Sequence, residues 1–233
     1  MMEKTCLVTG VGWGTGAAIA RKFAYYGYRV AMLARRADRL KTLADQIEGA
    51  HAYPCDVTDP EGLAQVVQQV CVELGSPRVV VHNAVGGVWG NYLEIDPADL
   101  HSTFQVNTMA LLYLSRLTIP AMIEKGGGAL VCTGNTAAYR GRPGYVGFAP
   151  TKAAQRILAE GIARDVGPQG VHVAYIMIDA VIDLRWTRKR YSDRPDEFFI
   201  KPEEIAREVY HVAHQPRGAW SFNVEIRPHG EVW

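Results

Sequence analysis

A glycine-rich segment close to the start of the chain restricts the fold more than any other feature. An apolar, strand-like run, Cys6–Val8, leads into this segment, and a helix-like stretch begins where it ends. Glycines let a backbone approach a pyrophosphate closely, and the N-terminus of the following helix offers free N–H groups and a partial positive charge. An ordinary tight turn also uses glycine, but the strand–loop–helix context favours a dinucleotide site. The residues predicted to form this site are Gly10, Gly12, Trp13, Gly14, Thr15 and Gly16, with a surface aromatic as the alternative role for Trp13.

The rest of the chain alternates apolar, strand-like runs with helix-like segments. The predicted strands are Cys6–Val8, Arg29–Ala34, His51–Cys55, Val79–His82, Ala129–Cys132, Val171–Ile178 and Ser221–Ile226. The predicted helices are Gly16–Gly27, Ala37 to about Glu48, Pro60–Leu74, about Pro97 to Glu124 with breaks, Tyr145–Val166 and Pro202 to about His214. Strands that are apolar on both faces belong to a parallel sheet covered by helices. Since no linker-like stretch interrupts the pattern, we predict one α/β domain over residues 1–233, with a Rossmann-type, doubly wound parallel sheet.

The composition excludes several classes of function. The chain has 233 residues, of which 48% are hydrophobic, and this suits one domain with a substantial core. The formal net charge is +1, so there is no electrostatic case for binding nucleic acid or an anionic membrane. No apolar run approaches the ~18 residues of a membrane span, and we expect no signal peptide. The four cysteines are scattered without metal-ligand spacing, so we expect free thiols, no metal and a cytoplasmic location.

Several motifs share the spacing of one enzyme family. Thr9, Gly10, Gly14 and Gly16 fit the pattern T-G-x-x-x-G-x-G, and further matches follow at Asp56-Val57, Asn83-Ala84-Val85-Gly86 and Asn107. Through these motifs the chain resembles the short-chain dehydrogenase/reductase family from residue 5 to about 183. The resemblance implies a nicotinamide cofactor, a small-molecule substrate and a homodimer or homotetramer. It also implies adenine contacts from Asp56 and Val57, and packing of Asn83, Ala84 and Val85 beside the cofactor.

The end of the second predicted strand indicates which nicotinamide cofactor binds. A site for NAD usually places Asp or Glu there to accept the ribose 2′-hydroxyl, whereas this chain has Ala34-Arg35-Arg36. A guanidinium binds a 2′-phosphate bidentately, and a carboxylate would repel it. We therefore expect NADP rather than NAD, with Arg35 as the first contact and Arg36 as support. The alternative is that one or both arginines are solvated charges at the start of the next helix.

The catalytic residues of the resembled family are present only in part. In that family a tyrosine transfers the substrate proton and a serine steadies the carbonyl oxygen. A lysine binds the nicotinamide ribose and lowers the tyrosine pKa, and an asparagine holds a water in a relay. Lys152 and Asn107 match, but Phe148 stands at the tyrosine position and Asn135 at the serine position. Phenylalanine keeps the ring and removes the acid, whereas Asn135 can still donate a hydrogen bond through its amide.

The loss of the tyrosine leaves three hypotheses for the chemistry. In the first, the acid is relocated to Tyr145, Tyr139, Asp179 or Asp183, for which packing or loop bracing is the alternative role. In the second, water or the lysine–asparagine relay supplies the proton to a hydride acceptor that needs little acid help, such as an iminium or an activated alkene. In the third, the cofactor binds but no hydride moves, and the chain is a silent or non-redox member of the fold.

We favour an NADP-dependent oxidoreductase of altered mechanism that acts on a small carbonyl-like substrate, namely a ketone, imine or enone. Trp89 and Tyr92 follow the Asn83 motif and are candidates for the wall of the substrate cleft. The charged and aromatic segment at about 184–200 is a candidate substrate lid, with a solvated loop as the alternative.

Overall fold

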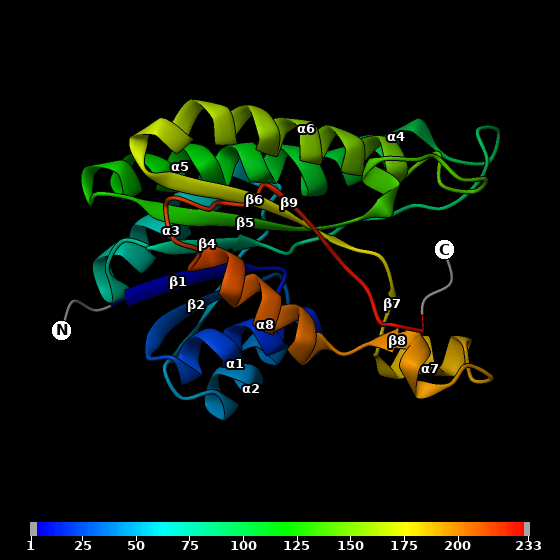
Figure 1. Cartoon of the computed structure of the whole chain (residues 1–233), viewed down its shortest axis with the longest axis horizontal. Helices are drawn as coiled ribbons and strands as arrows, with labels where there is room; N and C mark the ends of the chain where they lie inside the picture. Colours follow the sequence, from blue (N-terminus) through cyan, green and yellow to red (C-terminus); the bar gives the residue numbers. More distant parts are fainter. Residues whose placement is uncertain (1–3, 231–233) are drawn as a thin grey trace.

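A computed structural model describes residues 4–230, and its centre is a seven-stranded sheet in which every pair of neighbouring strands is parallel (Figure 1). The strand order is β3-β2-β1-β4-β5-β6-β9. The strands are β1 (Lys4–Thr9), β2 (Tyr28–Ala34), β3 (Ala50–Pro54), β4 (Val79–His82), β5 (Gly128–Asn135), β6 (Val171–Ile178) and β9 (Asn223–Ile226). The order changes direction between β1 and β4, and in such sheets a ligand binds outside the carboxyl ends of the strands at this point. The predicted fold class is therefore confirmed.

Helices cover both faces of the sheet, as strands that are buried on both sides require (Figure 1). One face carries α1 (Thr15–Tyr25), α2 (Ala37–Gln46) and α8 (Pro202–Ala213), and the other carries α3 (Pro60–Leu74), α4 (Pro97–Phe104), α5 (Ala110–Glu124) and α6 (Ala149–Val166). Phe23 and Val209 are fully buried on the first face, and Leu63 and Leu114 on the second. Each such side chain contributes about 1.5–3 kcal/mol by leaving water.

Two predicted boundaries are wrong in ways that affect the site. The helix predicted from Tyr145 begins at Ala149, because Gly144 has a φ of +78° and Pro150 lies in the first turn. Tyr145 therefore lies in the loop before α6. The strand predicted to end at Cys132 continues to Asn135, because β5 pairs with β6 over its whole length.

The long helical stretch Pro97–Glu124 contains a π-helical segment, Gln105–Met109, between α4 and α5. Among residues 4–230 this is the one stretch long and apolar enough to cross a membrane by length and composition, with a mean hydropathy of 1.3. Half of its most apolar part is buried inside the domain, where Leu111 and Leu114 pack on the sheet. These apolar residues therefore form core on the α3 side of the sheet.

The segment predicted as a lid has structure of its own. It contains α7 (Arg185–Arg190), and its base is fixed by two short paired strands, β7 (Val181–Ile182) and β8 (Phe199–Ile200). Figure 1 shows this unit apart from the main sheet, beyond the end of α8. Sequence patterns did not predict the two strands, since two residues are too few to show a period.

Candidate functional site

A cavity of about 810 Å³ opens at the carboxyl ends of β1, β4 and β5, beside the N-terminus of α1. The predicted site residues that line it are Gly10, Gly12, Gly14, Thr15, Gly16, Arg35, Asp56, Val57, Asn83, Ala84, Val85, Asn135, Phe148 and Lys152. Four predicted residues do not line it, namely Trp13, Arg36, Asn107 and Tyr145. Residues predicted to bind the cofactor and residues predicted for catalysis therefore line the same cavity.

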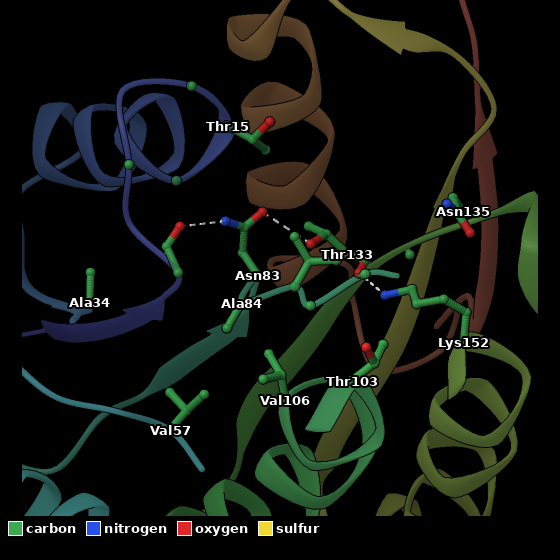
Figure 2. A pocket seen from close by; sticks show the side chains of 18 of the residues that line it. Thr15, Ala34, Val57, Asn83, Ala84, Thr103, Val106, Thr133, Asn135 and Lys152 are labelled. Atoms are coloured by element: carbon green, nitrogen blue, oxygen red, sulfur yellow. Dashed lines mark hydrogen bonds between the residues drawn. The ribbon is translucent and has the colours of Figure 1, made fainter. Parts of the chain in front are cut away.

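The glycine loop is held against the turn after β4. Gly10 has a φ of +69°, and a Cβ there would lie 2.5 Å from the backbone of Ala84, so only glycine allows this approach. Asn83 donates from Nδ2 to the Gly10 carbonyl at 3.0 Å and accepts from the Thr133 hydroxyl at 3.0 Å, as Figure 2 shows. Asn83 therefore joins β1, β4 and β5 at the floor of the cleft.

The N-terminus of α1 is suited to an anion. Gly14 precedes the helix without a side-chain cap, and the first turn of α1 contains no acidic residue. By contrast, Asp59 and Asp96 cap α3 and α4 through their carboxylates. The free N–H groups of α1 and its partial positive charge face the cleft beside the glycine loop, which is the arrangement that binds a pyrophosphate.

Two arginines lie at the far end of this loop. Arg35 follows β2, is exposed and lines the cavity. Arg39, in the first turn of α2, brings Nη1 to 3.8 Å from the position that a Cβ of Gly12 would occupy. Arg36 stands at the N-cap position of α2, and neither Arg36 nor Arg39 is among the residues that line the cavity. Arg39 is therefore a further cation near Gly12, and the supporting role of Arg36 stays a prediction.

Asp56 and Val57, which are predicted to contact adenine, lie at the cavity wall after β3. Thr58 holds the Asp56 carboxylate through its backbone N–H and its hydroxyl, at 3.0 and 2.8 Å. The carboxylate is thus fixed at the edge of the cleft, and Val57 is buried beside it.

Lys152 projects from α6 into the cleft and is only 2% exposed. Its ammonium donates to the Thr133 carbonyl at 3.3 Å, as Figure 2 shows, and to Oε1 of Gln155. Burial lowers the pKa of Lys152 to about 8. An ammonium has three donors, so two are used within the protein and one is left for a ligand in the cleft.

Asn107 acts through the backbone around it. Its Oδ1 accepts from the Gly86 N–H at 3.0 Å, and its Nδ2 donates to the Gly86 carbonyl and to the Thr151 hydroxyl. The side chain is fully buried and fixes the turn after β4 to α6. Its side chain is therefore a brace of the cleft wall, and the catalytic role expected for Asn107 stays a prediction.

Phe148 forms an aromatic wall at the position where the acid is missing. Its side chain is 5% exposed, with ring centroids 5.5 Å from Trp89 and 6.3 Å from Tyr145. Beside it, Asn135 accepts from the Ala137 N–H at 3.1 Å through Oδ1, which leaves Nδ2 as its donor. Asn135 lines both the main cavity and a neighbouring cavity of about 280 Å³, which Tyr145 also lines.

The remaining acid candidates are engaged elsewhere. Asp183 forms a bidentate pair with Arg188, at 2.7 Å for both contacts, and this pair lowers the Asp183 pKa. Asp179 lies 3.9 Å from Arg140 and lines the smaller cavity. The Tyr139 hydroxyl donates to Asn223 at 2.7 Å. The bracing role foreseen for the aspartates describes Asp183.

The segment predicted as a lid lies against the glycine loop. A Cβ on Gly14 would lie 2.5 Å from Cδ2 of Leu184, and Leu184 and Trp186 both line the main cavity. Trp13, Trp89 and Tyr92 are 53%, 61% and 76% exposed, and none of the three is among the residues that line the cavity. Within residues 4–230 no three His, Cys, Asp or Glu side chains gather as a metal site would require.

Comparison with known proteins identifies the fold family. The sequence model of the family described as short chain dehydrogenase matches residues 4–190. The chain belongs to the short-chain dehydrogenase family. A short chain dehydrogenase of Pseudocercospora fijiensis is 35% identical over 178 residues, which are 73% of this chain and 57% of that protein.

Two solved structures extend the likeness to almost the whole chain. An alcohol dehydrogenase from the archaeon Thermococcus sibiricus, complexed with 5-hydroxy-NADP, has a TM-score of 0.86 at 25% identity and covers 99% of this chain and 98% of its own. A metagenomic short-chain oxidoreductase in complex with NADP has a TM-score of 0.84 at 26% identity, with 97% of each chain covered. The family, the close-packed glycine loop and the uncapped helix together assign the cleft to a nicotinamide cofactor.

Sequence reasoning missed two residues of this short-chain dehydrogenase site. Arg39 lies four residues after Arg35, a helical spacing that could have indicated a second cation on the same side. Gln155 lies three residues after Lys152 on α6 and contacts its ammonium. A polar residue among the apolar positions of a core helix was the available signal for Gln155.

Proposed function

We propose that this chain transfers hydride between NADP and a small organic substrate whose double bond needs no proton from the protein, such as an iminium or an activated alkene. The observation that carries this proposal is the Phe148 ring, which lines the cleft beside Lys152 without a hydroxyl group. A ketone would become an alkoxide and need a proton, and losing a general acid costs about 10²–10⁴ in rate.

Hydride transfer to either favoured acceptor is balanced in electrons and protons without an acid from the protein. A bound nicotinamide supplies hydride. An iminium carbon accepts the hydride, and the C=N π electrons move to nitrogen, which becomes a neutral amine. An enone accepts the hydride at its β-carbon, and the electrons move to the carbonyl oxygen, which later takes a proton from water. Nδ2 of Asn135 is the donor that stabilises charge on that oxygen.

The aromatic wall also suits these acceptors. Phe148 lines the cleft, and it packs with Trp89, which is 61% exposed and lies outside the cavity lining. Aromatic faces attract a delocalised cation such as an iminium, by about 0.5–2 kcal/mol depending on desolvation. They equally offer an apolar surface to a conjugated alkene. A tyrosine hydroxyl at residue 148 would introduce a polar group into this wall.

The charge at the adenosine end supports NADP. Arg35 lines the cavity, and Arg39 lies near Gly12. A guanidinium pair attracts a 2′-phosphate by charge and by bidentate hydrogen bonds. The two solved relatives complexed with NADP or its 5-hydroxy derivative agree with this preference.

The test uses purified protein, NADPH and three substrates, namely an N-alkylated cyclic iminium, an enone and an unactivated ketone. Fluorescence titration should show NADPH binding, and absorbance should show NADPH oxidation with the iminium or the enone at least about 10²-fold faster than with the ketone. No response to NADPH would refute the cofactor assignment. Binding without oxidation of NADPH by any of the three would favour the non-redox function instead.

A further inference from the structure

Gln155 is a buried amide at the point where two functional groups of the site meet. Its side chain is fully buried on α6. Oε1 accepts from the Lys152 ammonium, and Nε2 donates to the Asn107 carbonyl at 2.7 Å. One side chain therefore connects the lysine of the cleft with the backbone of the π-helical segment.

The π-helical segment explains why that carbonyl is near enough to be bound. Around Gln105–Met109 the helix widens, and the Ala110 N–H bonds the Gln105 carbonyl five residues before it. Such single π turns are frequent at functional sites, because they displace the regular hydrogen-bond ladder. The Asn107 carbonyl accepts from Gln155, while the Asn107 side chain is separately engaged with Gly86 and Thr151.

We propose that Gln155 is a positioning residue whose amide lies between the Asn107 carbonyl and the Lys152 ammonium and blocks proton transfer along this link. We call this arrangement the closed link. The hydrogen bonds run in one direction, from the ammonium to Oε1 and from Nε2 to the carbonyl. An amide oxygen only accepts hydrogen bonds and an amide nitrogen only donates them. A water or a hydroxyl does both at one atom and can therefore pass a proton on, which the amide cannot. Lys152 therefore exchanges protons with solvent through the cleft.

A blocked proton path from Asn107 to Lys152 is consistent with the absence of a tyrosine at residue 148. A phenol that gives up its proton has to be resupplied, whereas Phe148 has no proton to give. The assignment of Gln155 depends on the proposed function only for this consequence, since the contacts themselves belong to the protein without cofactor.

The other groups around Lys152 cannot replace Gln155 as a partner of the ammonium. His82 on β4 is fully buried, and burial together with the Lys152 charge lowers its pKa to about 4. Cys132 on β5 is also fully buried, which raises the pKa of its thiol to about 12. Both are neutral at pH 7, so the ammonium relies on the oxygens of Gln155 and Thr133.

The first test measures the pKa of Lys152 in the cofactor-free protein, by NMR titration of ε-¹⁵N-lysine assigned with Lys152→Arg. Gln155→Leu removes the acceptor at similar size and should lower the pKa by about one unit, whereas Gln155→Glu adds an opposite charge and should raise it by about one unit or more. Gln68→Leu, on an exposed position of α3, is the matched control and should leave it unchanged. If Gln155→Leu fails to fold by circular dichroism, Gln155→Glu alone decides. A Lys152 pKa that does not move in a folded Gln155 variant overturns the proposal.

The second test examines the closed link itself. Phe148→Tyr supplies a phenol, and adding Gln155→Ala leaves room for water between Lys152 and Asn107. The double variant should reduce a ketone with NADPH at least about tenfold faster than Phe148→Tyr alone, through kcat rather than KM, and equal rates would overturn the closed link. Absence of NADPH oxidation in both variants, with any substrate, counts against the proposed function. In that case the pKa of Lys152 in the first test alone decides the assignment of Gln155.

Discussion

Replacing Arg35 by alanine should weaken NADPH binding far more than NADH binding. The two cofactors differ in the 2′-phosphate, and Arg35 is the cation that lines the cavity directly after β2. A hydrogen bond to a charged group contributes about 1.5–3 kcal/mol, and exposure of the side chain places this contact at the lower end. We therefore expect NADPH to bind about tenfold more weakly and NADH to bind within about twofold of the unaltered protein, measured by fluorescence titration at low salt.

The neighbouring arginines supply the controls for this experiment. Arg36→Ala removes the same side chain one residue later, at the N-cap position of α2 and outside the cavity, and should change neither affinity. Arg39→Ala should weaken NADPH binding and add to the effect of Arg35→Ala. Equal losses of NADPH and NADH affinity in Arg35→Ala would refute the 2′-phosphate assignment.

Three further predictions concern the reaction, stability and the lid. Phe148→Tyr should raise the rate of NADPH-dependent ketone reduction by about 10²-fold and lower the rate with the iminium, and no gain with the ketone would mean that more than the acid is missing. The pKa of His82 is lowered to about 4 from about 6.5 in the unfolded chain. The unfolded state therefore binds the extra proton between these values, and stability falls as the pH falls through that window. Urea unfolding at pH 7 and at pH 4.5 measures how far the free energy of unfolding falls in each protein. We expect this fall to be about 2–3 kcal/mol smaller in His82→Asn than in the unaltered protein, and equal falls would contradict a buried neutral imidazole. Arg188→Ala should speed proteolysis within 184–200 several-fold relative to Lys189→Ala, its neighbour on α7, because the carboxylate pairs of Arg188 hold this segment together; equal rates would contradict that role.

The sheet and most helices could be predicted from the sequence, because strands that are buried on both faces appear in it as short, continuous apolar runs. The valine run of β4 and the bounds of α3 and β6 were predicted correctly. The start of α6 was wrong, since Tyr145 continues the apolar pattern, while Gly144 and Pro150 set the actual beginning of the helix. The π-helical turn could not be predicted, because it changes the hydrogen-bond ladder without changing the apolar period.

The parts of the site that depend on close backbone packing could be predicted from the sequence. The parts that depend on which partner a side chain contacts could not. The glycine loop and Asn83 follow from close packing that few residues allow. Arg39 was missed, because the approach of its side chain to Gly12 depends on the direction of α2, which the sequence does not show. Gln155 was missed because one of its two contacts is to a π-helical carbonyl that lies far from it in the sequence.

The central claim is that hydride moves from NADPH to carbon without a proton from the protein, and isotope transfer tests it most directly. NADPH deuterated at both C4 positions is incubated with the protein and an N-alkylated iminium, and the amine is analysed by mass spectrometry while the rate is compared in H₂O and D₂O. We expect one deuterium on the former iminium carbon and a rate that is the same in both solvents. A product without deuterium, or a rate that falls clearly in D₂O, would contradict it.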